Sequence, residues 1–421
     1  MGITRNELGT RLRQAREASG LTQDDVAGHM ELSRPTITQI ELGNREVSSL
    51  ELDKLARLLG RDIGELLADH FENRDALGAL FRAHPEVLGE PHVADALRQC
   101  LAVGREVTNL ERLLGIARDA EAGAVYPLAV PTTRWEAVQQ GERVAEEERR
   151  RLGLGFAPLT DITDLLECEG LHTAVINLPD EVSGLTMLQE AIGILIATNQ
   201  AHSWVRRRFS FAHEYAHALL DRNRLATVSR TDDRAELPEV RANVFAANFL
   251  MPAEGVRQFV AQIGKGGPSR QKANVFDESG VLEVSTRAAP KSQDIQLYEV
   301  AALAHHFGVS RLAALYRLKN MQLLSDSELE TLKSQEESGL GDSIAKLLDL
   351  QEPDDDTDGN EFRRRIVNLA LEAYRLEEIS RSKLAELAAM IRLDVEQLNQ
   401  LLQTIGLDVD ERVEIAIPDA E

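Results

Sequence analysis

The 421-residue chain has little cysteine, few aromatic residues and no long apolar run. Its two cysteines, Cys100 and Cys168, are too few for a disulfide framework and lack the spacing of a zinc-binding pair, so we expect reduced thiols. No apolar stretch approaches the roughly 20 residues that span a bilayer, and the first residues lack the apolar core of a secretory signal. We therefore expect a cytoplasmic protein that makes no membrane contact.

Basic residues are also fewer than acidic residues. The chain has 47 Lys and Arg against 70 Asp and Glu, and its net charge of −23 argues against unspecific coating of nucleic acid. Hydrophobic residues still make up 43%, which is enough for packed cores, and the length suggests about two to four domains. The apolar residues recur mostly at helical spacing, with two short strand-like segments, which predicts an α+β, mostly α fold.

The stretch RRRFSFAHEYAHALLD, residues 206–221, has two histidines around a glutamate. On a helix, His213 and His217 stand at i and i+4 on one face, so both imidazoles can reach one ion. Zinc is coordinated by imidazole nitrogen, and a catalytic zinc site keeps one coordination position open. Glu214, next to the first histidine, suits a general base. The alternative is two packed histidines and an ion-paired glutamate, which would each need a buried partner. The pattern favours the metal site.

A zinc site of this kind needs a third protein ligand, and the segment AELPEVRANVFAANFLMP, residues 235–252, offers one. A helix should start after its first proline, and the small Ala242 and Ala246 would let that helix approach the histidine helix closely. Glu239 shares the side of these two alanines. Glu236 precedes the proline and is the weaker candidate.

The motifs RFSFAHEYAHALLD and EVRANVFAANFLMP, in this order and separated by a short segment, resemble those of the ImmA/IrrE metallopeptidase family. The resemblance covers roughly residues 131–321 and implies a zincin-like domain with a small sheet. It also implies the site residues: His213, His217 and Glu239 as ligands of Zn²⁺, and Glu214 as the catalytic base.

Two features depart from that family. Asp221 stands where many members have a histidine, which affects the surroundings of the metal and not the ligand set. Residues 264–280 form a polar, glycine-containing insert that predicts a mobile loop able to modify access to the cleft. Members of the family are associated with cleaving or inactivating repressors in stress responses and in the control of mobile elements, and some carry a DNA-binding domain in the same chain.

The first 70 residues predict a set of short helices. Thr22 and Ser33 are placed to cap two of them, and the second of these has Arg34 in its first turn. The string GLTQDDVAGHMELSRPTITQIELG resembles the helix-turn-helix domain of the XRE (lambda repressor-like) family, which implies DNA binding. The residues predicted to be buried are Leu12, Leu21, Val26, Ala27, Ile37, Ile40, Leu50, Leu55, Ala56 and Leu58.

In such domains the second helix of the pair enters the major groove. The candidate base readers are Arg34, Thr36, Thr38 and Gln39, and Gln23 with Asn44 or Arg45 is expected near phosphates. Residues 1–69 have nine Lys and Arg against twelve Asp and Glu, a net charge of −3, so the alternative is a helical module without DNA affinity. A basic face would favour binding; its candidates are Arg5, Arg11, Arg13 and Arg16.

The remaining segments complete the predicted organisation. After a helix-turn-helix domain over residues 1–70, we expect a helical connector (71–125), the zincin domain (126–325), an acidic linker (326–360) and a C-terminal helical domain (361–421) that serves oligomerisation or partner contact. Within the zincin domain we expect a helix at 134–151 and strands within 171–180 and 192–199. His305 and His306 are expected to pack, and the alternative is that one of them lines the cleft.

These patterns predict a transcriptional regulator that binds a double-stranded operator with an inverted repeat, as a homodimer. Its zinc peptidase would cleave or inactivate a regulatory protein, either a repressor-like substrate or the chain itself. The alternative is a non-proteolytic antitoxin or transcription factor whose zincin body senses a toxin, repressor or ligand. Glu214 favours the enzyme, and fusion to a DNA-binding domain favours the regulator.

Overall fold

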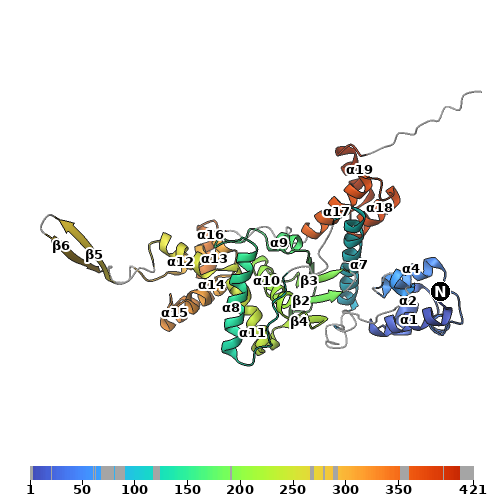
Figure 1. The fold of residues 1–421 in the computed structure, drawn as a ribbon, viewed down its shortest axis with the longest axis horizontal. Coiled ribbons are helices and arrows are strands. Elements are labelled where there is room, and N and C mark those ends of the chain that lie inside the picture. Colours follow the sequence, from blue (N-terminus) through green and yellow to red (C-terminus); the bar gives the residue numbers. More distant parts are fainter. Residues whose placement is uncertain are drawn as a thin grey trace, which may run out of the picture.

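The computed structural model describes residues 3–407, except 20, 60, 62, 68–79, 81–90, 117–123, 190–191, 266–269, 278–279, 288–292, 351–359 and 392. Most of the described chain is helical, and a four-stranded sheet lies near its middle (Figure 1). The predicted α+β, mostly α fold is therefore confirmed. No helix in the described ranges is long and apolar enough to cross a membrane.

The N-terminal domain is helical, as predicted. Its elements are α1 (Arg5–Ala18), α2 (Gln23–Met30), α3 (Arg34–Glu41), α4 (Ser49–Leu58) and α5 (Ile63–Leu67). The Thr22 hydroxyl accepts from the backbone N–H of Asp25, and that of Ser33 accepts from Thr36, so both predicted caps are confirmed.

The predicted core of this domain is largely correct. Leu21 and Leu58 are partly buried, and the prediction for Leu50 is wrong because its side chain is 77% exposed. Leu50 lies in the first turn of α4, off the stripe of Leu52, Leu55 and Leu59 that faces the core. The other predicted residues are all buried: Leu12, Val26, Ala27, Ile37, Ile40, Leu55 and Ala56.

Helix α7 (Pro91–Leu113) is the described part of the predicted connector, together with the residues that flank 117–123. Its first half packs Val93 and Leu97 against the sheet, and its second half packs Val107 against the C-terminal helices. Helix α4 also contacts α7. In addition, Arg98 of α7 donates to the backbone carbonyl of Ser19, the residue that caps the end of α1. One helix therefore contacts three parts of the molecule.

The sheet consists of β1 (His172–Ile176), β2 (Val182–Gln189), β3 (Gly193–Asn199) and β4 (Ala226–Arg230). Its order is β1-β3-β2-β4; β1 and β3 are parallel, and β2 is antiparallel to both of its neighbours. The strands predicted within 171–180 and 192–199 are β1 and β3. The sequence analysis missed β2 and β4.

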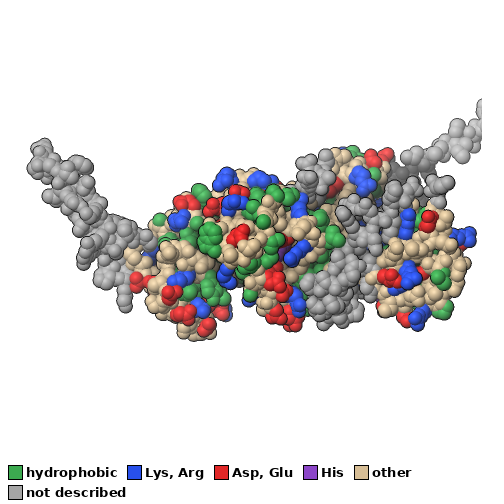
Figure 2. All heavy atoms as spheres, turned by 60° about the horizontal axis from the view of Figure 1, so that its bottom comes forward, with side chains coloured by type: hydrophobic (Ala, Val, Ile, Leu, Met, Phe, Trp, Pro, Cys, Tyr) green, Lys and Arg blue, Asp and Glu red, His purple; other side chains and the backbone are tan. Residues whose placement is uncertain are grey.

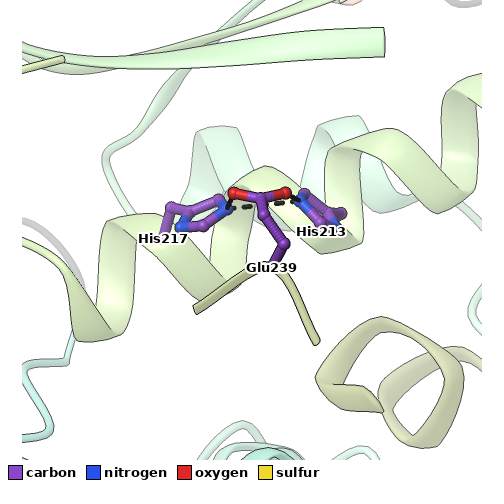
Figure 3. Close-up of side chains that lie close together, drawn as sticks. All are labelled: His213, His217 and Glu239. Atoms are coloured by element: carbon purple, nitrogen blue, oxygen red, sulfur yellow. Dashed lines mark hydrogen bonds and ion pairs between the residues drawn. The ribbon is translucent and has the colours of Figure 1, made fainter. Parts of the chain in front are cut away.

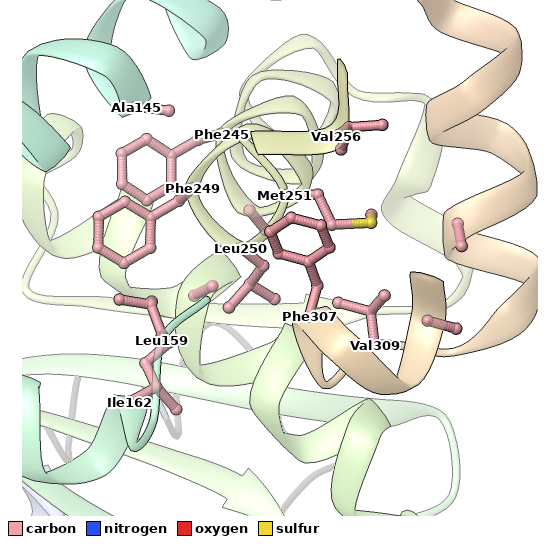
Figure 4. Close-up of a cluster of buried hydrophobic side chains, with 14 of the residues drawn as sticks. Ala145, Leu159, Ile162, Phe245, Phe249, Leu250, Met251, Val256, Phe307 and Val309 are labelled. Carbon is pink, nitrogen blue, oxygen red and sulfur yellow. The ribbon is translucent and has the colours of Figure 1, made fainter. Parts of the chain in front are cut away.

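Helices cover the sheet and hold the histidine motif. They are α8 (Arg134–Arg151), α9 (Ile162–Cys168), α10 (Trp204–Leu220), the 3-10 turn η1 (Asp232–Ala235), α11 (Leu237–Leu250) and α12 (Ala253–Gln262). Phe245 and Phe249 of α11 stack inside a large apolar core, which Figure 4 shows together with Phe307. At Gly141 of α8, a Cβ atom would lie 2.6 Å from the carbonyl oxygen of Arg241, so only glycine allows this close approach of α8 to α11.

The elements that follow α12, up to residue 350, differ from the prediction in two places. They are β5 (Arg270–Asp277), β6 (Gly280–Arg287), α13 (Leu297–Phe307), α14 (Arg311–Asn320), α15 (Asp326–Glu337) and α16 (Leu340–Leu347). The insert at 264–280 was predicted as a loop, but it contributes β5 to an antiparallel pair with β6. Where an acidic linker was predicted from residue 326, the chain forms α15 and α16, and Leu329 and Leu332 join the core. Residues 351–359 lie outside the described ranges.

The C-terminal helices are α17 (Asn360–Arg375), α18 (Arg381–Met390) and α19 (Val395–Thr404). They form a small core with the second half of α7, in which Ile366, Leu384 and Leu402 are buried. Arg365 of α17 also donates to Glu111 of α7, at 2.8 Å. This region therefore packs on the connector helix within the same chain.

Candidate metal centre and DNA-binding surface

Helix α10 places His213 and His217 one turn apart, and α11 brings Glu239 to meet them (Figure 3). The two Nε2 atoms are 3.2 Å apart. Glu239 Oε2 lies 3.0 Å from His213 Nε2, and Glu239 Oε1 lies 3.2 Å from His217 Nε2. All three side chains are buried, and they are a group of potential ligands that could hold one metal ion. Glu236 instead precedes α11 as its exposed N-cap.

These distances fit a zinc ion. A tetrahedral ion about 2.0 to 2.1 Å from its ligands separates neighbouring ligand atoms by about 3.3 to 3.4 Å, close to the three distances observed. Each imidazole Nδ1 faces an oxygen: Asn243 Oδ1 lies 3.1 Å from His213 Nδ1, and Asp221 Oδ2 lies 2.8 Å from His217 Nδ1. With both Nδ1 atoms donating, the Nε2 lone pairs point at the carboxylate of Glu239. Three electron-rich groups that converge in a buried space require a cation.

The surroundings of the triad hold the imidazoles in place. Asp221 accepts from His217 and, through its other oxygen, from the guanidinium of Arg241 at 2.7 Å. Burial opposes protonation, but the hydrogen bonds with Asp221 and Glu239 raise the pKa of His217 to about 10. Burial likewise opposes the ionisation of Glu239, yet the hydrogen bonds from both histidines hold its pKa well below the usual range. In the absence of metal, a proton on His217 therefore supplies the positive charge beside Glu239.

Asn243 and Arg241 were not singled out from the sequence. Asn243 lies four residues after Glu239, on the same side of α11, and this spacing was the available signal. Asp221 was noted only as a departure from the family. In the structure it occupies the position that orients His217.

Glu214 lies beside the triad and is fully buried against β2. Its Oε2 accepts from the Thr186 hydroxyl at 2.8 Å, whereas Oε1 has no hydrogen-bond partner among the described residues. Burial raises the pKa of Glu214 above its usual value. A Cβ at Gly184 would lie 2.9 Å from Glu214 Oε1, so a glycine in β2 makes room for this carboxylate.

A cleft of about 480 Å³ opens on the triad and is lined by both His213 and Glu239. Residues from α10, β4, η1, α11 and α14 form its walls. His305 and His306 do not line it: His305 lines another pocket and His306 packs on Phe259. The suggestion that one of these histidines lines the cleft is therefore wrong.

The candidate base readers lie on α3 and its flanks, and several of them bond to one another. Thr38 donates to the side-chain oxygen of Gln23, and Gln23 donates to Glu41 at 2.8 Å. Asn44 donates to Gln39 at 3.0 Å. These contacts preset the side chains of α3 and its flanks before any ligand binds.

Two arginines and one threonine complete the predicted set. Arg34 is exposed and lies 3.6 Å from Asp24, and Arg45 donates to Glu51 at 2.8 Å. Thr36 is partly exposed in the first turn of α3.

The expected basic face on α1 does not form. Arg5 pairs with Glu46, Arg13 with Glu17 and Arg16 with Glu41, and Arg11 donates to a backbone carbonyl. On the face seen in Figure 2, positive and negative side chains alternate over this domain, at the right of the view. Arg34 and Arg45 around α3 lie next to Asp24 and Glu51 in the same way, so any charge for binding phosphates has to come from arginines that also lie near acidic residues.

Comparisons with known proteins agree with this division of the chain. The family model described as a helix-turn-helix domain matches residues 7–69, and the model described as an IrrE N-terminal-like domain matches residues 168–267, which include the triad and Glu214. A search of curated proteins found none that is similar.

Among solved structures, ComR from Streptococcus suis aligns over 93% of this chain and 94% of its own, at 13% identity and a TM-score of 0.16, a similarity too low to support any conclusion. The two family matches confirm the resemblances drawn from the motifs. The chain joins an XRE-type helix-turn-helix DNA-binding domain to an IrrE N-terminal-like domain of a metallopeptidase family.

Proposed function

We propose that this protein is a transcriptional regulator whose zinc-dependent peptidase domain cleaves a regulatory protein. The observation that carries the proposal is the buried group of His213, His217 and Glu239 with Glu214 beside it, at the end of an open cleft. The substrate is a repressor-like protein or another copy of this chain. The helix-turn-helix domain binds an operator with an inverted repeat, as a homodimer.

The residues divide the work in a definite way. His213, His217 and Glu239 would hold zinc, which when bound acts as a Lewis acid on a peptide carbonyl and lowers the pKa of water. The carboxylate of Glu214 accepts a proton from the attacking water and then donates it to the leaving amine nitrogen. Thr186 holds the other oxygen of Glu214, and Asp221 keeps the lone pair of His217 Nε2 turned towards the metal.

A second candidate function is supported by a specific observation. Glu214 is absent from the residues that line the cleft, and it is buried against Thr186. The carboxylate of Glu214 would have to move to reach a substrate in the cleft. In this second function the body binds a partner, such as a toxin or repressor, without cleaving it, and reports its presence to the DNA-binding domain.

A cleavage assay separates the two. Zinc-loaded protein and its Glu214→Gln variant are incubated with a library of random peptides, and new termini are identified by mass spectrometry. The peptidase function predicts new termini with the first protein and none with the variant, at equal zinc content. Equal cleavage by both would remove Glu214 from its role, and peptide binding without any cleavage would favour the second function.

A further inference from the structure

The cleft beside the triad is positively charged although the chain is strongly acidic. Arg206, Arg230, Arg234 and Arg317 line it, and Glu239 of the triad is the only acidic residue among the lining residues that the structure describes. The whole chain has a net charge of −23. A patch of opposite sign at the mouth of a site attracts and orients anionic ligands.

Two of these arginines have no hydrogen-bond or ion-pair partner among the residues that the structure describes. Arg317 donates to the carbonyl of Met251 and to Asn248, so its role is structural. By contrast, Arg206 and Arg234 are both exposed, and neither forms a hydrogen bond or ion pair with any described residue. Both line the same cleft. Burial lowers the pKa of Arg206, and the positive charge of Arg234 lowers it further. Two like charges left close together make a site for an anion.

Their distance from the reacting centre follows from the helix. Arg206 precedes His213 by seven residues on α10, which puts both on one face about 10.5 Å apart along the axis. Arg234, in η1, precedes Glu239 by five residues and lines the same cleft. An extended peptide advances about 3.3 Å per residue, so the separation of Arg206 from His213 along the helix corresponds to about three peptide residues.

An apolar wall faces the same cleft. Phe209 of α10 lines it together with Leu312 and Tyr316 of α14, whose side chains are 44% and 45% exposed. Large apolar side chains left exposed in a cleft next to cationic groups suit a peptide that presents both kinds of side chain. A small inorganic anion would leave this wall uncovered.

We propose that Arg206 and Arg234 form a specificity site for a carboxylate of the peptide substrate, about three residues from the scissile bond, with an apolar substrate residue against Leu312 and Tyr316. This deepens the proposed peptidase function and rests on it. The carboxylate belongs to an Asp or Glu side chain. A C-terminal carboxylate has the same chemistry, so the test includes peptides with amidated ends.

The test is affinity selection followed by direct binding measurements. A random peptide library, with free or amidated C-termini, is selected on zinc-loaded Glu214→Gln protein, which cannot use the proposed base. Selection is repeated on Glu214→Gln protein that also carries Arg206→Gln and Arg234→Gln. Arg257→Gln is the matched control because this exposed arginine lies outside the cleft. Equal zinc content and melting temperature show that the variants are folded.

We expect Asp or Glu to be enriched at one position in both libraries, and the double arginine variant to bind the best acidic peptide about tenfold more weakly. The control should bind it normally. Changing both arginines to glutamate should shift the selection towards Lys or Arg. Enrichment only in peptides with a free end would assign the site to a C-terminal carboxylate, contrary to the side-chain assignment.

Other results would overturn the inference. These are no selected peptides, selection without acidic residues, or an acidic preference that survives loss of both arginines. The parent function fails separately: if the unaltered protein does not cut the peptides that the Glu214→Gln protein binds, the carboxylate site stands and the peptidase function does not.

Discussion

At the scale of single residues, the proposed metal ligands depend on neighbouring groups that would not touch the metal. Asp221 links His217 to Arg241 through its two oxygens, and Asn243 holds His213. Such partners fix the ring orientation and raise the basicity of the ligand. The motif alone predicted His213, Glu214 and His217. Glu239 was chosen from helix spacing and family resemblance. Helix spacing places Asn243 on the same side of α11 as Glu239, but its contact with His213 also depends on how α11 crosses α10, which spacing alone does not determine.

Substituting Asp221 tests this support. We expect Asp221→Asn to weaken zinc binding about 10- to 100-fold, because the negative charge next to His217 is removed while the side-chain shape stays. The measurement is competition with a zinc chelator. Asp180→Asn, in the exposed turn before β2, is the control and should bind zinc normally. Unchanged affinity of the Asp221 variant would show that its contact with His217 has no effect on the metal.

The pKa of His217 predicts how zinc binding depends on pH. That pKa is raised to about 10 in the metal-free protein, so His217 carries a proton at pH 7 and must lose it to bind zinc. Zinc binding at pH 7 should therefore release about one proton, and affinity should rise with pH up to about 10. Calorimetry in buffers of different ionisation enthalpy measures this release, and a value near zero would contradict the assignment.

The same shift determines the stability of the metal-free protein. A folded-state pKa above the ordinary 6.5 means that His217 contributes stability fully below about pH 6.5 and loses it as the pH rises towards 10. The melting temperature of metal-free protein should therefore fall over this interval. The His217→Ala variant should show a weaker dependence, and an equal fall in both proteins would assign the effect to other groups.

At the scale of elements, helices with clear apolar stripes were predictable and the less regular elements were not. Thr22, Ser33 and the periodicity of residues 134–151 gave correct helices. In β2, a glycine and three polar residues break the alternation that marks a strand. The glycine, Gly184, leaves space for Glu214. Helix α15 has many charges, which suggested a linker, but Leu329 and Leu332 suffice to anchor it.

The close contact of α8 with α11 determines where Glu239 lies. We expect Gly141→Ala to destabilise the body by about 1 to 3 kcal/mol and to weaken zinc binding, because the added Cβ would meet backbone 2.6 Å away and move α11. Gly28→Ala in α2 is the control, since its Cβ meets nothing within 4 Å and alanine favours helix. Thermal unfolding and zinc competition provide the measurements. An unchanged melting temperature in Gly141→Ala would show that α11 moves freely away from α8.

Helix α3 is the element that should read DNA. Gln39→Ala should weaken binding to an operator, selected from random duplexes, by about 1 to 3 kcal/mol, because this exposed amide can reach a base edge. Gln14→Ala removes an exposed amide from α1 and should bind normally. Fluorescence anisotropy at fixed salt measures both. Selection that enriches no sequence would indicate a protein-interaction domain instead.

At the scale of the whole molecule, α7 joins three parts of the chain. It contacts α4, packs on the sheet beside the metal site and carries the C-terminal helices. A stiff helix transmits geometry better than a flexible tether. A ligand in the cleft changes DNA affinity only if it binds the DNA-competent and incompetent arrangements differently.

We expect peptide occupancy of the cleft to change operator affinity at least fivefold in the Glu214→Gln protein, where the proposed cleavage is blocked. Operator titrations with and without a selected peptide measure the coupling. Arg206→Gln with Arg234→Gln serves as the control, because weaker peptide binding should shift the effect to higher peptide concentration. Identical operator affinities at saturating peptide would mean that the two domains share a chain without communicating.

The central claim is that His213, His217 and Glu239 hold one zinc ion. The most direct test is the metal content of purified protein, measured by mass spectrometry. We predict about one zinc per chain in the unaltered protein and in Glu214→Gln, and little in His213→Ala or Glu239→Ala. Glu236→Ala, three residues from the ligand, should keep its zinc. Full zinc retention in both His213→Ala and Glu239→Ala would contradict the account.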